Sequence, residues 1–265
     1  MFDSGVGGLT VMRAIAARLP HESIVYLGDT ARLPYGTKSA ETVTRYAVQA
    51  VKHLKRHDVK AIVVACNTAS AVALPALEAA LAPLPVLGVV GPGARAAVAA
   101  THRHHIAVIA TEGTVRGGAY ERAIRALDPT AKVTQQPCAL FVALAEEGWI
   151  DGPVAEEAAR RYLTPLFENG AGPDTLVLGC THFPALKGVI GRVAGKAVAL
   201  VDSAATTAEE LARVLEEKGL TAAKDAKPEY RFLATDAPER FARVGGLFLD
   251  HPIDAGAVEL VDLAQ

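Results

Sequence analysis

Short, uninterrupted apolar runs recur along this chain, and stretches with helical periodicity separate them. Three of the runs are AIVVA at 61–65, HIAVIAT at 105–111 and TLVLG at 175–179. They show no alternation of apolar and polar residues, which is typical of strands buried on both faces of a parallel sheet. After Ser39, a predicted N-cap, apolar residues recur at helical spacing: Val43, Tyr46, Ala47, Ala50, Val51 and Leu54. The pattern predicts an α/β fold in which helices cover parallel sheets on both sides. It also predicts a helix that runs to Leu81, a helix over 115–127, helices across 139–168 and a strand over 197–201.

The pattern restarts near the middle of the chain. FDSGVGGLTVMRAI (2–15) parallels ATEGTVRGGAYERAI (110–124), because each has a strand end, a glycine turn and a helix ending in Arg-Ala-Ile. We therefore predict two pseudo-symmetric parallel-sheet α/β domains with the active site in the cleft between them. The first would comprise residues 1–91 plus 203–265, and the second residues 92–202.

Composition and charge exclude several classes of protein. The 265-residue chain has a formal net charge of −2, so it lacks the basic field that nucleic-acid binding uses. No apolar run approaches the length of a membrane span, and no leader marks the chain for export. Three cysteines in such a chain favour free thiols in a reducing cytoplasm. We predict a cytoplasmic protein with a small-molecule substrate and no nucleic-acid or membrane partner. The sequence leaves the oligomeric state open, a homodimer included.

Two of the three cysteines stand at the end of predicted strands, in VVACNTAS (63–70) and VLGCTHFP (177–184). Ligands of parallel α/β sheets bind beyond the carboxyl ends of the strands, near helix N-termini. A helix N-terminus also favours a thiolate or a bound carboxylate. Short polar groups follow each cysteine, namely Asn67, Thr68, Thr181 and His182. Two such units facing one another would place a thiol on each side of one cleft.

Opposed thiols suit proton exchange at a stereocentre. One side removes a proton as a thiolate, the other delivers a proton as a thiol, and the reverse reaction exchanges the two roles. A free thiol has a pKa of about 8.5, so both forms are within reach near neutral pH. Asp3, Glu146 and His182 are the groups that we expect to tune the thiols. This chemistry needs no cofactor and no metal.

The glycine-rich stretch GVGGLT (5–10) suggests a dinucleotide site as an alternative. It has the first two glycines of that fingerprint, and Asp29 follows the next strand at about the right distance. However, Thr10 stands where the third glycine or alanine belongs, and only Met1 and Phe2 precede the turn. Either the first strand is unusually short or the chain starts late. We favour a helix N-terminus that receives a substrate carboxylate.

A metal site is the other alternative for the cysteines. Cys66, Cys180 and His182 could supply three ligands, but Cys-x-His is not a usual ligand spacing and no fourth ligand suggests itself. Cys138 stands alone in QQPCAL. We expect it to be a small buried hydrophobe.

Four motifs in order, FDSGVGGLT, DTARLPYG, ACNTAS and GCTHFP, resemble the cofactor-independent aspartate/glutamate racemase family over nearly the whole chain. The resemblance implies two domains that enclose one glutamate, with paired cysteines that interconvert its enantiomers without pyridoxal phosphate. It implies that Cys66 is the base toward D-glutamate and Cys180 the base toward L-glutamate. A supply of D-glutamate for peptidoglycan is the role that it implies.

The resemblance also implies the contacts of the site. Asp3 and His182 would assist the thiols, and Glu146 fits the family's acidic position after LFVALA. The substrate would contact Asp3, Ser4, Tyr35, Gly36, Asn67, Thr68, Thr181 and His182, with Tyr35 acting chiefly through the loop backbone. CTH, where aspartate enzymes typically have CTE, favours glutamate over aspartate as the substrate. An aspartate racemase is the nearest rival. A two-lobed binding protein or a dinucleotide-dependent enzyme, with incidental cysteines, is the alternative from another class.

Overall fold

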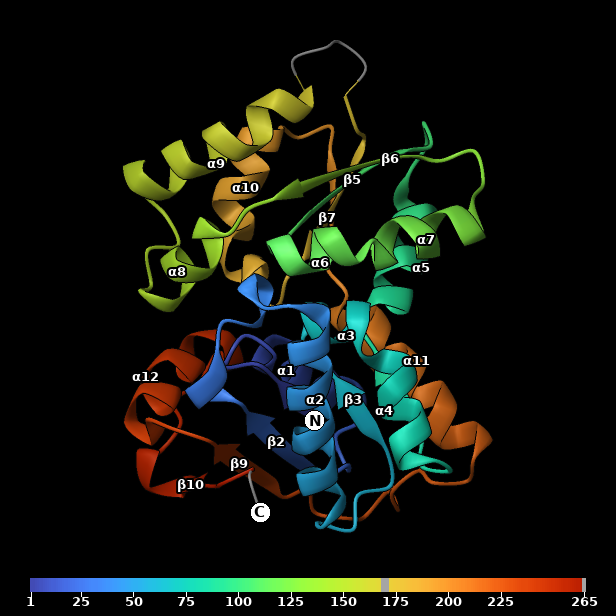
Figure 1. Cartoon of the computed structure of the whole chain (residues 1–265), viewed down its shortest axis with the longest axis vertical. Coiled ribbons are helices and arrows are strands. Elements are labelled where there is room, and N and C mark those ends of the chain that lie inside the picture. The colour runs from blue at the N-terminus through green and yellow to red at the C-terminus, as the bar shows by residue number, and fades with distance from the viewer. Residues whose placement is uncertain (168–171, 264–265) are drawn as a thin grey trace.

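The computed structural model describes residues 1–167 and 172–263, and its strands form two parallel sheets (Figure 1). The larger sheet contains β1 (Phe2–Asp3), β2 (Ile24–Gly28), β3 (Ile62–Val64), β4 (Val86–Gly88), β9 (Tyr230–Ala234) and β10 (Val258–Leu260). The smaller sheet contains β5 (His105–Ala110), β6 (Lys132–Pro137), β7 (Thr175–Gly179) and β8 (Ala199–Val201). Their orders are β10-β9-β2-β1-β3-β4 and β6-β5-β7-β8. Each pairing among the described strands is parallel, which confirms the predicted fold class.

Helices connect the strands and pack against both sheets (Figure 1). Those of the first half are α1 (Leu9–Arg18), α2 (Ala40–Lys55), α3 (Asn67–Val72), α4 (Leu74–Leu81), α5 (Val90–Ala100), α6 (Glu112–Gly117) and α7 (Ala119–Leu127). Those of the second half are α8 (Leu140–Glu146), α9 (Pro153–Phe167), α10 (Lys187–Ala194), α11 (Ala204–Glu217) and α12 (Pro238–Leu249). None of the helices in the described part of the chain combines the length and apolarity needed to cross a membrane.

The uninterrupted apolar runs do lie in strands that are buried on both faces. In β3, Ile62 and Val64 belong to a core cluster with residues of α2, α3 and α4, whereas Val63 belongs to a cluster with residues of α1 and α11. In β5, Ile106 and Ala107 divide between two clusters in the same way. Each face of the strand therefore meets its own layer of helices, which is why the sequence shows no alternation.

Helix α2 begins where the sequence predicts it. The Ser39 hydroxyl caps the helix by accepting a hydrogen bond from the Thr42 backbone N–H at 3.2 Å, which satisfies one of the free donors of the first turn. Its predicted apolar face is buried at Val43, Ala47, Ala50, Val51 and Leu54, whereas Tyr46 is half-buried.

The first strand, β1, has only two residues, as the short stretch before the glycine turn suggests. β1 nevertheless pairs with both neighbours, because Phe2 lies opposite Leu27 of β2 and Val64 of β3. Asp3 pairs with Gly28 and has no exposed surface. At the far side of β2, β9 and β10 bring the end of the chain into the larger sheet. The division of the chain at 91/92 and 202/203 stays a prediction.

Several predicted boundaries are wrong. The helix expected over 115–127 breaks at Gly118, whose φ of +61° favours glycine. The helix expected to run to Leu81 breaks near Ala73, and α4 then begins at Leu74 with Pro75 in its first turn. The predicted strands 61–65 and 197–201 are shorter than expected, at three residues each.

Two elements were not predicted. α5 begins within Val90-Gly91-Pro92-Gly93, which looks like a turn, but Pro92 lies in the first turn, where its missing N–H costs nothing. β10 has only three residues at the sheet edge, and two of them are exposed. The helical stretch predicted across 139–168 ends in residue 168, which lies outside the described residues.

Candidate active site

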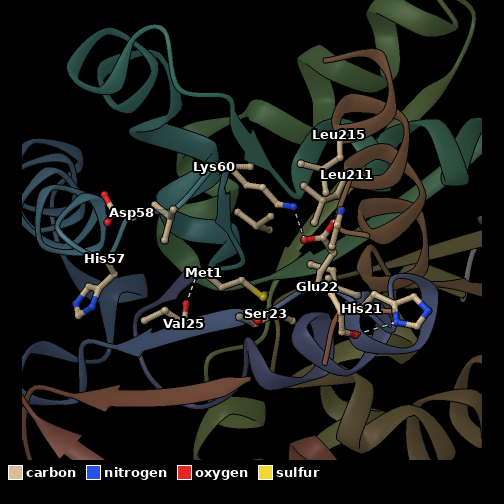
Figure 2. Close-up of a pocket in the computed structure, with 17 residues that line it drawn as sticks. Met1, His21, Glu22, Ser23, Val25, His57, Asp58, Lys60, Leu211 and Leu215 are labelled. Atoms are coloured by element: carbon tan, nitrogen blue, oxygen red, sulfur yellow. Dashed lines mark hydrogen bonds and ion pairs between the residues drawn. The ribbon is translucent and has the colours of Figure 1, made fainter. Parts of the chain in front are cut away.

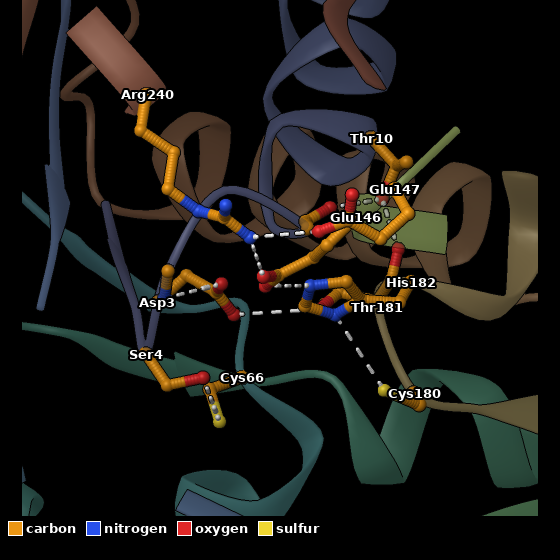
Figure 3. A network of polar contacts seen from close by, with 12 residues as sticks. Asp3, Ser4, Thr10, Cys66, Glu146, Glu147, Cys180, Thr181, His182 and Arg240 are labelled. Carbon is orange, nitrogen blue, oxygen red and sulfur yellow. Dashed lines mark hydrogen bonds and ion pairs between the residues drawn. The ribbon is translucent and has the colours of Figure 1, made fainter. Parts of the chain in front are cut away.

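The two cysteine motifs lie at the carboxyl ends of one strand in each sheet. Cys66 follows β3 and caps α3, and Cys180 directly follows β7. Both thiols are almost fully buried, with 4% and 7% of the residue exposed. Asp3, at the carboxyl end of β1, lies between the two motifs (Figure 3). The structure thus gathers the predicted cysteines and Asp3 in one enclosed region between the sheets.

Cys66 lies in a setting that favours the neutral thiol. Its Sγ–H donates to Ser4 Oγ at 3.6 Å, and Sγ accepts from the Ala69 N–H at 3.5 Å. Burial, and then the nearby Asp3 carboxylate, raise the pKa of Cys66 to about 12. At neutral pH this residue therefore carries a proton that it can deliver.

Cys180 has a different neighbour. Its Sγ lies 3.8 Å from Nδ1 of His182, and Nε2 of that ring lies 3.1 Å from Oε1 of Glu146 (Figure 3). Burial alone would lower the pKa of His182, but contacts with Cys180 and Glu146 and the charge of Asp3 raise it to about 10. The ring is therefore an imidazolium at neutral pH, and a cation beside sulfur stabilises a thiolate.

Glu146 completes this row of groups. Burial would keep its carboxyl group neutral, but contacts with His182 and Arg240 outweigh burial and lower its pKa. Its Oε2 accepts from the Arg240 guanidinium at 3.0 Å. Arg240, on α12, has no motif that marks it in the sequence.

Asp3 joins the glycine-rich turn to the Cys180 loop. It accepts hydrogen bonds from the Gly5 N–H at 3.0 Å and, through its other oxygen, from the Thr181 hydroxyl at 3.5 Å. Burial raises its pKa in spite of the charge of His182 and the backbone N–H groups that face the carboxylate. An ammonium group next to Asp3 would offset that burial cost.

Asn67 and Thr68 are held by residues of the other sheet's helices. The Tyr120 hydroxyl donates to Asn67 Oδ1 at 2.7 Å. The Thr68 hydroxyl lies 2.9 Å from that of Thr111 and 3.1 Å from that of Thr114. The sequence reading missed these three partners. The internal repeat carried a signal for one of them, because Thr111 occupies the place in ATEG that Asp3 occupies in FDSG.

The loop with Tyr35 and Gly36 packs against the segment after β5. The Tyr35 ring is buried and its hydroxyl donates to Asp29, so the phenol group is already occupied. A Cβ at Gly36 would lie 2.5 Å from Cβ of Thr111. Only glycine therefore lets this loop pack so closely on the segment after β5.

The glycine-rich stretch has a comparable packing role. A Cβ at Gly7 would lie 2.5 Å from the Thr181 hydroxyl and 2.6 Å from Nδ1 of His182. The missing side chain brings the turn before α1 against the Cys180 loop. The Thr10 hydroxyl, at the mismatched position of the fingerprint, donates to Gly7 O at 2.9 Å.

The two remaining sequence candidates are the metal site and Cys138. Among residues 1–167 and 172–263, no group of three or more His, Cys, Asp and Glu side chains could hold a metal ion. Cys138 is fully buried, and its Sγ–H donates to Gln136 O at 3.6 Å.

A cavity of about 320 Å³ lies near the amino ends of β2 and β3, where Met1, Glu22 and Lys60 line it (Figure 2). Glu22 and Lys60 form an ion pair there at 2.6 Å. The two cysteines follow the carboxyl ends of their strands, where parallel sheets bind their ligands. This cavity lies at the amino ends of the strands, which is the opposite edge of the larger sheet.

Comparison with known proteins agrees with this arrangement. Residues 8–211 match the family model for Asp/Glu/hydantoin racemase. A glutamate racemase from Geobacter metallireducens is 52% identical over 249 residues, which cover 94% of this chain and 91% of that protein. The crystal structure of glutamate racemase from Francisella tularensis in complex with D-glutamate superposes with a TM-score of 0.91 at 38% identity, covering 99% of this chain and 96% of that one. A glutamate racemase isoform from Bacillus anthracis gives a TM-score of 0.93 at 41% identity, with the same coverage. The chain therefore belongs to the Asp/Glu/hydantoin racemase family and is a racemase, which is an isomerase.

Proposed function

We propose that this chain interconverts L- and D-glutamate by moving a proton at the α-carbon between Cys66 and Cys180, without a cofactor. The observation that carries the proposal is the pair of buried thiols, each at the carboxyl end of a strand in a different sheet. Because the surroundings of the two thiols differ, we assign Cys180 as the base and Cys66 as the proton donor when L-glutamate binds. The glutamate racemases similar to this chain support the choice of substrate.

From L-glutamate, Cys180 acts as the base. The His182 imidazolium beside it stabilises the thiolate, which takes the α-proton and leaves an electron pair on the α-carbon. The Cys66 thiol then donates its proton to the opposite face of that carbon. The product is D-glutamate, with Cys180 as thiol and Cys66 as thiolate.

From D-glutamate the roles are exchanged, so Cys66 must first lose its proton. The raised pKa of Cys66 opposes this in the free protein. The substrate ammonium supplies a positive charge that lowers the cost, and Asp3 is the carboxylate that we assign to that ammonium. The short polar groups of Ser4, Asn67, Thr68 and Thr181, with the backbone of Tyr35 and Gly36, are the contacts that we assign to the rest of the substrate.

We also infer that the D-glutamate formed is used for peptidoglycan in the cytoplasm, the role that the family resemblance implies. The homodimer stays a prediction, which sedimentation of the purified protein tests.

Isotope exchange tests the two-thiol assignment. In deuterated water, D-glutamate newly formed from L-glutamate should carry deuterium at the α-carbon from the first turnovers, because the proton delivered comes from a solvent-equilibrated thiol. Unreacted L-glutamate should stay largely protiated, and the pattern should mirror from the other enantiomer. Nuclear magnetic resonance with chiral chromatography measures both.

Variants sharpen the test. Cys66→Ala and Cys180→Ala should each abolish racemisation in both directions, since each direction needs one thiol as base and the other as acid. Cys138→Ala is the matched control and should keep turnover. Early product that retains the substrate's proton, or a Cys180→Ala protein that still racemises, would contradict the mechanism. Turnover of aspartate at the same rate as glutamate would contradict the assignment of glutamate as the substrate.

A further inference from the structure

Arg240 forms an ion pair that joins the end of the chain to the candidate site. It lies on α12, and its guanidinium donates to Glu146 of α8 at 3.0 Å (Figure 3). Glu147 lies 3.7 Å away as a second carboxylate. α12 lies between β9 and β10 in sequence, which belong to the larger sheet, whereas α8 follows β6 of the smaller one. The ion pair therefore crosses the seam between the two halves of the fold.

This pair differs from the arginine–carboxylate pairs in which both side chains are exposed. In a pair such as Arg213–Glu217 both side chains are more than half exposed, and pairs of that kind contribute little. The Arg240 side chain is 46% exposed, but that of Glu146 is only 12% exposed. A carboxylate shielded from water depends more on its protein partners.

Both oxygens of Glu146 are used, which fixes the direction of the carboxyl group. Oε2 accepts from Arg240, and Oε1 faces Nε2 of His182 at 3.1 Å. The other ring nitrogen of His182 faces Cys180 Sγ. α12 also touches the same imidazole through Phe248, whose ring stands edge-on with the centroids 5.3 Å apart.

We propose that Arg240 is a positioning residue, which holds Glu146 so that His182 stays directed at the Cys180 sulfur. The inference rests on the proposed function, because it acts on the thiol assigned as the base for L-glutamate. Arg240 itself touches neither thiol. Its effect reaches the reaction through one carboxylate and one imidazole.

The groups around His182 set the expected consequence. Cys180 faces it on its own loop, Asp3 faces it from β1 and Glu146 faces it from α8. Without Arg240 the Glu146 side chain is free to turn toward solvent, and His182 loses the contact that supports its charge. A less charged ring stabilises negative charge on the Cys180 sulfur less, so the removal of the α-proton slows. The pKa of His182 itself should fall toward its ordinary value.

Arg240→Met removes the charge and keeps the length of the side chain, whereas Arg240→Lys keeps the charge. Outer partners of metal-ligating histidines are typically worth about 10- to 100-fold in affinity or activity. By analogy, for Arg240→Met we expect a loss of about tenfold in kcat with little change in KM. Because the two enantiomers are equally stable, kcat/KM must fall by the same factor from either side. Because the pKa of His182 should fall, the alkaline limb of the pH profile should move to lower pH. Arg240→Lys should recover much of both.

Two controls separate positioning from general damage. Arg243→Met changes an exposed arginine on the same helix and should leave kcat and the pH profile unchanged. In a Glu146→Gln background, Arg240→Met should add no further loss, because the carboxylate through which it acts is gone. Circular dichroism checks that each variant is folded.

The outcomes divide clearly. A wild-type protein that does not racemise glutamate sinks the proposed function. If the wild type racemises and Arg240→Met keeps its kcat and pH profile, only the role of Arg240 fails. A loss of equal size in the Glu146→Gln background, or no recovery with Arg240→Lys in a folded protein, also overturns it.

Discussion

His182 carries its charge because of three acidic neighbours and in spite of its burial. Its pKa is about 10 in the folded protein, against an ordinary value of 6.5. Between these two values the folded chain binds a proton that the unfolded chain has released. The free energy of unfolding therefore falls as pH rises through this window, and the stabilisation is complete only below about pH 6.5.

The titration of His182 gives a prediction for stability. From pH 7 to pH 9.5, the wild-type protein should lose more stability than His182→Gln, which has no proton to release at this position. Urea denaturation of both proteins at the two pH values measures the difference. Parallel loss in the two proteins would mean that His182 does not carry the proton assigned to it.

Single residues of the site differ in how far the sequence predicts them. Cys66 and Cys180 stand out because the chain repeats their setting, an apolar strand followed by short polar groups. Asp3, Glu146 and His182 were found partly through the family motifs, and the structure brings all five together. Arg240 lies in an ordinary amphipathic helix, 94 positions from Glu146. Only tertiary packing brings Arg240 to the site, so no local sequence pattern predicts its role.

Helices α3 and α6 meet at the seam through three threonine hydroxyls. Thr68, Thr111 and Thr114 lie within 3.1 Å of one another in pairs. Each hydroxyl can donate one hydrogen bond and accept another, so three of them form a closed ring with no water. All three residues are buried, which makes a missing partner costly.

Thr114→Val tests this ring by removing one hydroxyl without changing the shape of the side chain. A buried hydroxyl that loses its partner costs about 1–3 kcal/mol, so we expect the free energy of unfolding to fall by about 1–2 kcal/mol. Thr44→Val, on the partly exposed side of α2, is the control and should change it by less than about 0.5 kcal/mol. Equal effects of the two substitutions in urea denaturation would contradict the ring.

The sequence predicted which segments form helices and strands more accurately than it predicted where each one begins and ends. The helix after Ser39 was found because its cap and its apolar face agree. The break at Gly118 was missed because glycines also occur inside helices, and only the backbone shows which one adopts a positive φ. β10 was missed because three residues at a sheet edge, two of them exposed, carry no hydrophobic pattern. Their pairing with β9 defines the strand.

The two sheets enclose the thiols so completely that reagents have no direct approach. Cys66 and Cys180 follow the carboxyl ends of β3 and β7 and keep a little exposed surface, whereas Cys138 has none. Access to the first two requires the halves to separate, and access to Cys138 requires local unfolding. A bound substrate that contacts both halves should hold them together.

Alkylation with iodoacetamide checks this view of access. In the native protein Cys66 and Cys180 should react more slowly than the same thiols in urea at the same pH, and glutamate should slow both further. Cys138 should react only when the protein unfolds, so it serves as the internal control. Mass spectrometry of the labelled peptides gives the three rates. Labelling of the two site cysteines that ignores glutamate would show that they do not share one enclosed site.

The placement of β9 has a consequence for how the chain is made. The described strands of the smaller sheet lie within residues 105–201. The larger sheet is complete only after β9 and β10, near the end of the chain, have been synthesised. While the ribosome is still adding these residues, β2 presents an open edge, the kind of surface on which nascent chains aggregate. The same last segment carries α12 with Arg240 and Phe248. A chain released early would therefore be prone to aggregate and would lack the contacts that direct His182, so an incomplete copy would be both poorly soluble and poorly active.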